Sequence, residues 1–98
     1  MRALPARDVR QALASKGFQA DTDKKKKRDH EMFFLVVEGR RSGFFVKISR
    51  GATELRLDEI ANNARQAGVA PSELFKVLSC ELDSNGTLTL YRNRRPQG

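Results

Sequence analysis

The chain has 98 residues, of which 39% are hydrophobic and 32% charged, so it can bury one modest core and is too apolar to stay disordered. Its net charge of +7 and sequence pI near 10.2 favour a polyanionic partner, with nucleic acid first and an acidic protein, or charge that serves solubility alone, as alternatives. No apolar run reaches membrane-spanning length and residues 1–20 do not resemble a signal peptide, so we expect a cytoplasmic protein with no membrane partner.

The first predicted element is a helix over residues 5–16. Pro5 suits the first helical turn, and Val9 and Leu13 recur at helical spacing. Gly17 is a stop signal, because a glycine readily adopts the left-handed conformation that ends a helix. A short strand over residues 18–20 is expected to follow.

Residues 21–29, with the sequence DTDKKKKRD, are predicted to form an exposed loop. Its run of cations consists of Lys24, Lys25, Lys26, Lys27 and Arg28. Five adjacent like charges repel one another and cannot enter a core. Two interpretations stay open: the run is a solvated loop, or it is an arm that contacts RNA phosphates.

Residues 32–37 and 44–48 are apolar segments on either side of a Glu-Gly-Arg-Arg-Ser-Gly connection, which predicts a β-hairpin. Its core is assigned to five residues: Phe34, Val36, Phe44, Val46 and Ile48. The first strand is apolar on both faces, so the sheet should have a core face and a second, partly apolar face. We expect the C-terminal segment, a second copy in a homodimer, or a binding partner to cover that second face.

The remainder of the chain predicts a helix over residues 57–67, a helix over residues 71–79, a turn at residues 83–86 and a short extra strand over residues 87–91. The buried stripe of the first of these helices is assigned to Leu57, Ile60, Ala61 and Ala64. Residues 92–98 are expected to be a flexible basic tail. This order predicts one α+β domain with two layers, spanning residues 1–98.

The sequence has no zinc-type ligand spacing and no phosphate-binding glycine loop, so no metal or cofactor is predicted. Cys80 is the only cysteine, which suits a reducing compartment, and it follows an apolar helix. We interpret Cys80 as a small core residue rather than a nucleophile.

His30, the only histidine, stands where the cationic loop becomes a strand. Histidine can transfer protons near neutral pH, and RNA cleavage needs such a group but no metal; the alternative is an ordinary surface residue. Because hairpin strands run side by side, His30 should lie near Ser49 and Arg50, and Lys47 or Arg50 would stabilise a charged phosphorane. Arg40 and Arg41 are assigned to RNA or partner contact at the turn.

Several of these segments resemble the HicA-type toxins, which are small ribonucleases with a double-stranded-RNA-binding-like (dsRBD-like) fold. The segments are RDVRQALASKGF at residues 7–18, His30-x-x-Phe33, residues 38–49, and residues 57–69 with their ending ARQAGV. The chain departs from the family at Arg28 and Asp29, where Gly-Ser is common, and at Arg50, where some related sequences carry histidine.

The resemblance implies an α-β-β-β-α core with a three-stranded antiparallel sheet over residues 4–69, followed by a C-terminal extension at residues 70–91. It also implies that His30 is the general acid/base of a metal-independent mRNA endoribonuclease, neutralised by a HicB-type antitoxin. The alternative is a non-catalytic RNA-binding or protein-interaction module on the same fold.

Overall fold

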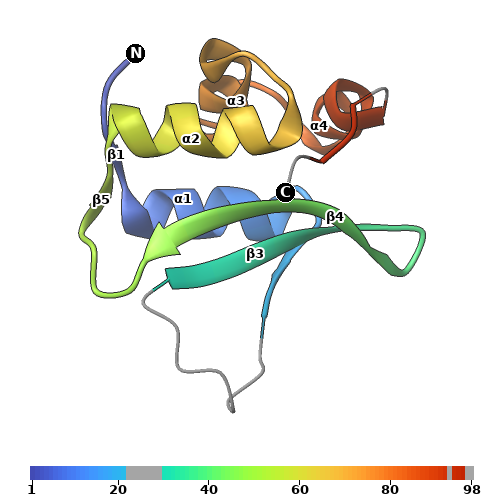
Figure 1. The fold of residues 1–98 in the computed structure, drawn as a ribbon, viewed down its shortest axis with the longest axis horizontal. Helices are drawn as coiled ribbons and strands as arrows, with labels where there is room; N and C mark the ends of the chain where they lie inside the picture. Colours follow the sequence, from blue (N-terminus) through green and yellow to red (C-terminus); the bar gives the residue numbers. More distant parts are fainter. Residues whose placement is uncertain (22–29, 93, 97–98) are drawn as a thin grey trace.

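The computed structural model describes residues 1–21, 30–92 and 94–96, which form an α+β fold (Figure 1). A three-stranded antiparallel sheet has the order β2–β3–β4, and the short strands β1 and β5 pair separately. The elements in chain order are β1 (Leu4–Pro5), α1 (Ala6–Ser15), β2 (Phe18–Ala20), β3 (His30–Val37), β4 (Arg40–Ser49), β5 (Glu54–Leu55), α2 (Leu57–Ala67), α3 (Pro71–Leu78) and α4 (Ser84–Arg92). The α+β class and the three-stranded sheet confirm the expectation, whereas β1 and β5 were not predicted.

The hairpin turn is shorter than the sequence suggested. Glu38 and Gly39 alone form it, with φ of 51° and 77°, so Arg40 already pairs with Val37 inside the ladder. Two consecutive left-handed residues are the geometry of a two-residue hairpin turn whose twist matches the flanking strands. The two arginines assigned to the turn therefore belong to β4.

An irregularity in β4 occupies the rest of the expected connection. The register shifts between Phe34 and Val36, so that three residues of β4 face Leu35 alone. The Ser42 hydroxyl donates to the Leu35 carbonyl at 2.6 Å and accepts the Phe44 N–H at 3.2 Å. Ser42 thus replaces the ladder hydrogen bonds that the bulge removes.

One face of the sheet packs against the helices. Val9 and Leu13 of α1 share a buried cluster with Phe33 and Leu35 of β3. The cluster also contains Phe44, Val46 and Ile48 of β4 and Ile60, Ala64 and Ala67 of α2. The assignment of Phe34 and Val36 to the core is wrong: both are only half-buried and lie on the opposite face, because strand side chains alternate.

Helix α2 runs along the free edge of β4 and is hydrogen-bonded to it. The Lys47 N–H donates to Asn63 Oδ1 at 2.8 Å, and Asn63 Nδ2 donates to the Lys47 carbonyl at 3.1 Å. One turn further, the Phe45 N–H donates to Gln66 Oε1 and Gln66 Nε2 donates to the Gly43 carbonyl. Two amide side chains therefore satisfy an edge that would otherwise be open to another strand.

This arrangement changes the predicted buried stripe of α2. Leu57 is 45% exposed and Ala61 is half-buried, whereas the polar Asn63 is buried. The stripe is rotated so that Ile60, Ala64 and Ala67 meet the core. A hydrophobicity pattern alone could not identify this buried stripe. Part of the helix face that meets the sheet carries amide side chains, which bind the backbone of β4 and do not pack against apolar side chains.

The C-terminal segment after α3 is helical, so the predicted strand over residues 87–91 is wrong. Asp83 precedes α4, and its carboxylate accepts the Gly86 N–H at 2.7 Å, as at a helix N-cap. Thr87 and Tyr91, four residues apart, are the buried positions of the helix. The Thr87 hydroxyl donates a hydrogen bond to the Asp83 carbonyl, four residues earlier. This bond helps the helix to accommodate a β-branched side chain.

Both C-terminal helices pack on the side of the sheet that carries α1 and α2 (Figure 1). Tyr91 meets Phe44 and Phe18 edge-to-face, with ring centroids 4.8 and 6.0 Å apart. Of the three covers expected for the second sheet face, the C-terminal segment is therefore ruled out for the residues that the structure describes.

The interpretation of Cys80 as a core residue is also wrong. Cys80 is exposed just beyond α3, in a left-handed conformation with φ of 64°. The buried Lys16 ammonium donates to the Val77 carbonyl at 3.3 Å and to the Cys80 sulfur at 3.4 Å. The Lys16 cation therefore satisfies the C-terminal end of α3, not that of its own helix.

Candidate functional site

The sheet face that points away from the helices, called the outer face, collects most of the described residues to which the sequence assigns chemistry. The register of the sheet and the alternation of side chains define it. Its members are Gln19, Asp21, His30, Met32, Phe34, Val36, Arg41, Phe45, Lys47 and Ser49. None of the four apolar members, Met32, Phe34, Val36 and Phe45, is fully buried.

Two aromatic rings between two cations form the centre of this face, and we call these four residues the outer-face strip. The Phe34 and Phe45 ring centroids are 5.8 Å apart. The Arg41 guanidinium lies over the Phe34 ring, 4.2 Å from its centroid, and the Lys47 ammonium lies 5.7 Å from the Phe45 centroid. The two cations, held near the rings by cation–π attraction, therefore cover part of the apolar face predicted from the sequence.

The edge hydrogen bonds explain why the strip is compact. Phe45 and Lys47 turn their backbone groups to α2, so the pairs they form with β3 are the non-hydrogen-bonded pairs of the antiparallel ladder. Side chains are closest in such pairs. By alternation the same holds for the pair of His30 and Ser49.

His30 lies at one end of the outer face, exposed and opposite Ser49, which confirms the register expected from the hairpin. The Ser49 hydroxyl donates to Glu59 Oε2 at 3.3 Å, and Arg50 follows at the exposed end of β4. A substrate can approach this imidazole from solvent, because no element of the described chain packs over the outer face.

Asp21 is a functional candidate that the sequence analysis missed. Its N–H donates to the Met32 carbonyl at 2.8 Å, which extends the β2 ladder by one residue beyond Ala20. Its carboxylate lies on the outer face, 3.8 Å from the Arg41 guanidinium. Because Asp21 is opposite Met32, it is a diagonal neighbour of His30, at a separation typically of about 7–8 Å between backbones.

Glu31, the nearest carboxylate in the sequence that the structure describes, points elsewhere. Its carboxylate is paired with the Arg10 guanidinium at 2.7 Å on the α1 side of the sheet. Adjacent strand residues point to opposite faces of a sheet, so Glu31 faces away from His30. Extending the alternation of residues 18–20 to Asp21 would have identified the correct carboxylate.

The remaining site predictions separate into two groups. Arg40 is exposed at the far end of the hairpin from His30, beside the turn. The run formed by Lys24, Lys25, Lys26, Lys27 and Arg28 lies outside the described residues. The structure therefore joins His30, Lys47 and Arg41 on one face and leaves Arg40 at the tip.

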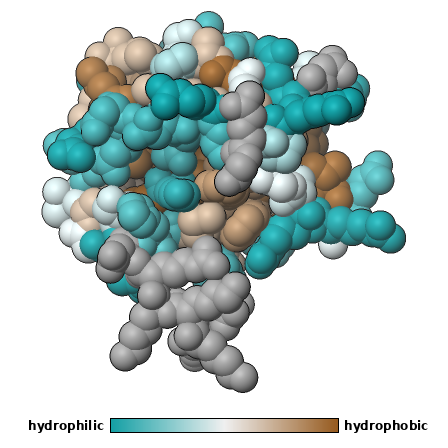
Figure 2. Space-filling model, in the orientation of Figure 1, coloured by the Kyte–Doolittle hydropathy of each residue, from teal (hydrophilic) through white to brown (hydrophobic). Residues whose placement is uncertain are grey.

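Among residues 1–21, 30–92 and 94–96, no three His, Cys, Asp or Glu side chains gather in a way that could hold a metal ion. Over the same residues no helix is both long and apolar enough to cross a membrane. The face of the molecule in Figure 2 is mainly hydrophilic, with small separate apolar patches.

Comparison of the chain with protein-family models, curated proteins and solved structures found no match. Chemically, the outer face offers a stacking surface, fixed cations, a carboxylate and one imidazole. These are the groups that bind single-stranded nucleic acid and transfer protons.

Proposed function

We propose that the chain is a HicA-type toxin that binds mRNA on the outer face and cleaves it without a metal, with His30 as a general acid/base. The observation that carries this proposal is the position of exposed His30 at the end of a sheet face that holds two phenylalanine rings between two cations. The succession of helix α1, an antiparallel β2–β3–β4 meander and helix α2 supports a dsRBD-like fold.

The binding step uses the outer-face strip. Bases of single-stranded RNA stack on aromatic rings, with a gain of about 1–3 kcal/mol per base, and cations beside the rings contact the phosphates. Phe34 and Phe45 supply the rings, and Arg41 and Lys47 the cations. The run of cations at residues 24–28 would add phosphate contacts that are independent of sequence.

The cleavage step needs two proton transfers. The 2′-hydroxyl attacks the adjacent phosphorus and loses its proton to a base, while the 5′-oxygen leaves and takes a proton from an acid; the products are a 2′,3′-cyclic phosphate and a 5′-hydroxyl. A carboxylate can accept the first proton, and an imidazole group that carries a proton can donate the second. Asp21 is then the base and His30 the acid, with Lys47 stabilising the phosphorane.

A non-catalytic RNA-binding module on the same fold is the second candidate. The outer-face strip favours it, because stacking and phosphate contact need neither His30 nor Asp21. In that case the His30→Ala variant would bind RNA as the wild type does, and neither would cleave it.

Expression in bacteria tests the toxin. The wild type should arrest growth, His30→Ala should not, and co-expression of a HicB-type antitoxin from an adjacent gene should relieve the arrest. Arg65→Ala, a change at an exposed residue of α2 away from the outer face, should arrest growth like the wild type. Unimpaired growth with the wild type, or equal arrest by His30→Ala, would refute a His30-dependent toxin.

A further inference from the structure

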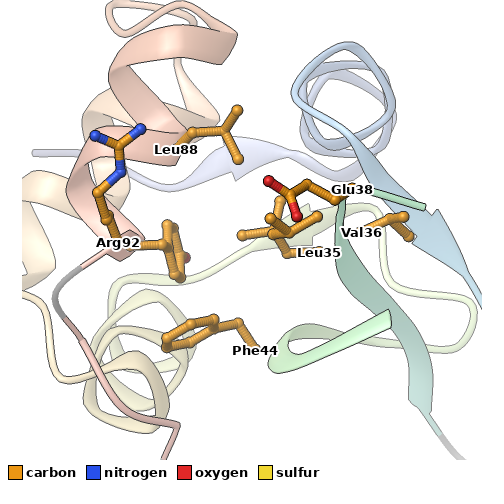
Figure 3. A pocket seen from close by; sticks show the side chains of 8 residues that line it. Leu35, Val36, Glu38, Phe44, Leu88 and Arg92 are labelled. Atoms are coloured by element: carbon orange, nitrogen blue, oxygen red, sulfur yellow. The ribbon is translucent and has the colours of Figure 1, made fainter. Parts of the chain in front are cut away.

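A concave site lies at the opposite end of the hairpin from His30. A cavity of about 390 Å³ opens between the hairpin tip and α4, with a wall formed by Leu35, Phe44, Leu88 and Tyr91 (Figure 3). Its volume is within the range of roughly 300–1,000 Å³ typical of small-ligand pockets. The bulge in β4 shapes this cavity, because it moves Phe44 out of the regular ladder and toward Tyr91.

Two charges of opposite sign flank this apolar wall. The Glu38 carboxylate points toward the cavity from the hairpin turn, and Arg92 lines the opposite side at the end of α4 (Figure 3). Neither takes part in an ion pair with any residue that the structure describes. Both charges are therefore available to a ligand that also fills the apolar space between them.

Glutamate is an unusual residue for the backbone conformation that Glu38 adopts. Its φ of 51° lies in the left-handed region, which glycine, asparagine and aspartate adopt more readily than glutamate. A sequence optimised for the turn alone would place one of those residues there. The longer glutamate side chain brings a carboxylate to the cavity, which the turn itself does not require.

We propose that this cavity binds a free α-amino acid with a large apolar side chain, such as leucine. The ligand carboxylate would pair with the Arg92 fork, its ammonium with Glu38, and its side chain would contact Leu35, Leu88 and Tyr91. The charges at the rim distinguish this class from a purely apolar ligand. The site does not depend on the proposed RNA chemistry, since it shares no residue with the outer-face strip or His30.

Titration of the full-length protein with L-leucine, followed by the amide NMR spectrum, tests the proposal. Saturable shifts should appear at Leu35, Leu88 and Tyr91 and not at His30. Glu38→Gln and Arg92→Gln should each weaken binding roughly tenfold or more, because each removes one charge-assisted contact. Arg94→Gln is the matched control: it removes a cation just beyond α4 whose partner is Glu73, and it should leave binding unchanged.

The compound N-acetyl-L-leucine amide keeps the leucine side chain but carries neither an ammonium nor a carboxylate group. It therefore tests whether the two charges of the ligand contribute to binding. It should bind at least tenfold more weakly than L-leucine. Equal binding of the two, equal affinity in the two charge variants, or no saturable shift with L-leucine would each overturn the proposal. If Glu38→Gln disturbs the turn, Glu38→Asn keeps the preferred backbone conformation and is expected to lose the same affinity.

Discussion

Asn63 binds both backbone groups of Lys47, and so joins helix α2 to the edge of the sheet. The Lys47 N–H donates to Asn63 Oδ1 at 2.8 Å, and Asn63 Nδ2 donates to the Lys47 carbonyl at 3.1 Å and to the Glu59 carbonyl at 3.0 Å. The same pair fixes Lys47 on the outer face, where its ammonium lies near Phe45. A structural contact on the helix side thus positions a proposed functional cation on the other side.

The Asn63→Ala variant should lower the free energy of unfolding by about 1–3 kcal/mol, because it leaves two partly buried backbone groups of Lys47 without their side-chain partner. Urea denaturation measures the change. Asn62→Ala, at the neighbouring exposed position, is the control and should change stability by less than about 0.5 kcal/mol. Equal effects of the two substitutions would show that the edge contacts do not stabilise the fold.

The geometry of the hairpin turn predicts that substitutions at two adjacent positions change the free energy of unfolding in opposite directions. Glu38→Asn should raise the unfolding free energy by about 0.5–1 kcal/mol, because asparagine tolerates the left-handed conformation at φ 51° better than glutamate. Gly39→Ala should lower it by about 1 kcal/mol or more, since alanine is disfavoured at φ 77°. Thermal denaturation of both variants checks the pair, and a stabilising Gly39→Ala would contradict this turn.

Asp83 provides a test of helix α4. Asp83→Ala should cost about 0.5–2 kcal/mol, because the Gly86 N–H loses its acceptor, whereas Asp83→Ser should keep most of the stability. Denaturation measures both. Identical losses in the alanine and serine variants would argue against capping at this position.

Because of Tyr91, the free energy of unfolding should depend on pH in the alkaline range. Burial raises the pKa of its hydroxyl far above the ordinary value of 10.0. Below pH 10 both the folded and unfolded states hold this proton, and stability is fully present. Above pH 10 the unfolded state releases the proton first, so the unfolding free energy falls as pH rises, by at most about 1.4 kcal/mol per pH unit.

The single tyrosine allows a direct measurement, because the phenolate absorbance of the protein reports Tyr91 alone. Ionisation should coincide with alkaline unfolding, and Tyr91→Phe should reduce the loss of stability above pH 10. Titration of the wild-type phenol near pH 10 with the fold intact would contradict its burial.

The hairpin and the first three helices could be predicted from the sequence because their signals are local. Gly17, with φ of 90°, ends α1 as expected, and the antiparallel register followed from the two apolar runs. The strands β1 and β5 have two residues each and no periodicity, so only tertiary contact reveals them. The alternation in Thr87–Tyr91 suggested a strand, but buried contacts of Thr87 and Tyr91 at helical spacing decide for a helix.

The site could be predicted in part for the same reason. The pair of His30 and Ser49 follows from hairpin register alone. Asp21 was missed because it follows a three-residue strand, where one further ladder hydrogen bond decides which way its side chain points. The pocket between the hairpin tip and α4 could not be found, since its helix was predicted as a strand and its bulge has no periodic signal.

Phe45 tests RNA binding on the outer face. Phe45→Ala should weaken the affinity for single-stranded RNA by about 1–3 kcal/mol, because it removes one stacking surface. Lys47→Gln should also weaken binding and reduce the dependence of affinity on salt, whereas Arg65→Gln, with the same change of charge, should not. Fluorescence anisotropy at several salt concentrations measures the RNA affinity of all three variants. Equal effects of the two charge changes would show that RNA does not bind on the outer face.

Cleavage of single-stranded RNA by the purified protein in the presence of EDTA tests the central claim most directly. The wild type should produce fragments with 2′,3′-cyclic phosphate ends. His30→Ala should reduce the rate at least roughly a hundredfold, and Asp21→Asn should reduce it while RNA affinity is kept. Absence of cleavage by the wild type, or an unchanged rate in His30→Ala, would contradict the assignment of His30 as the catalytic acid/base.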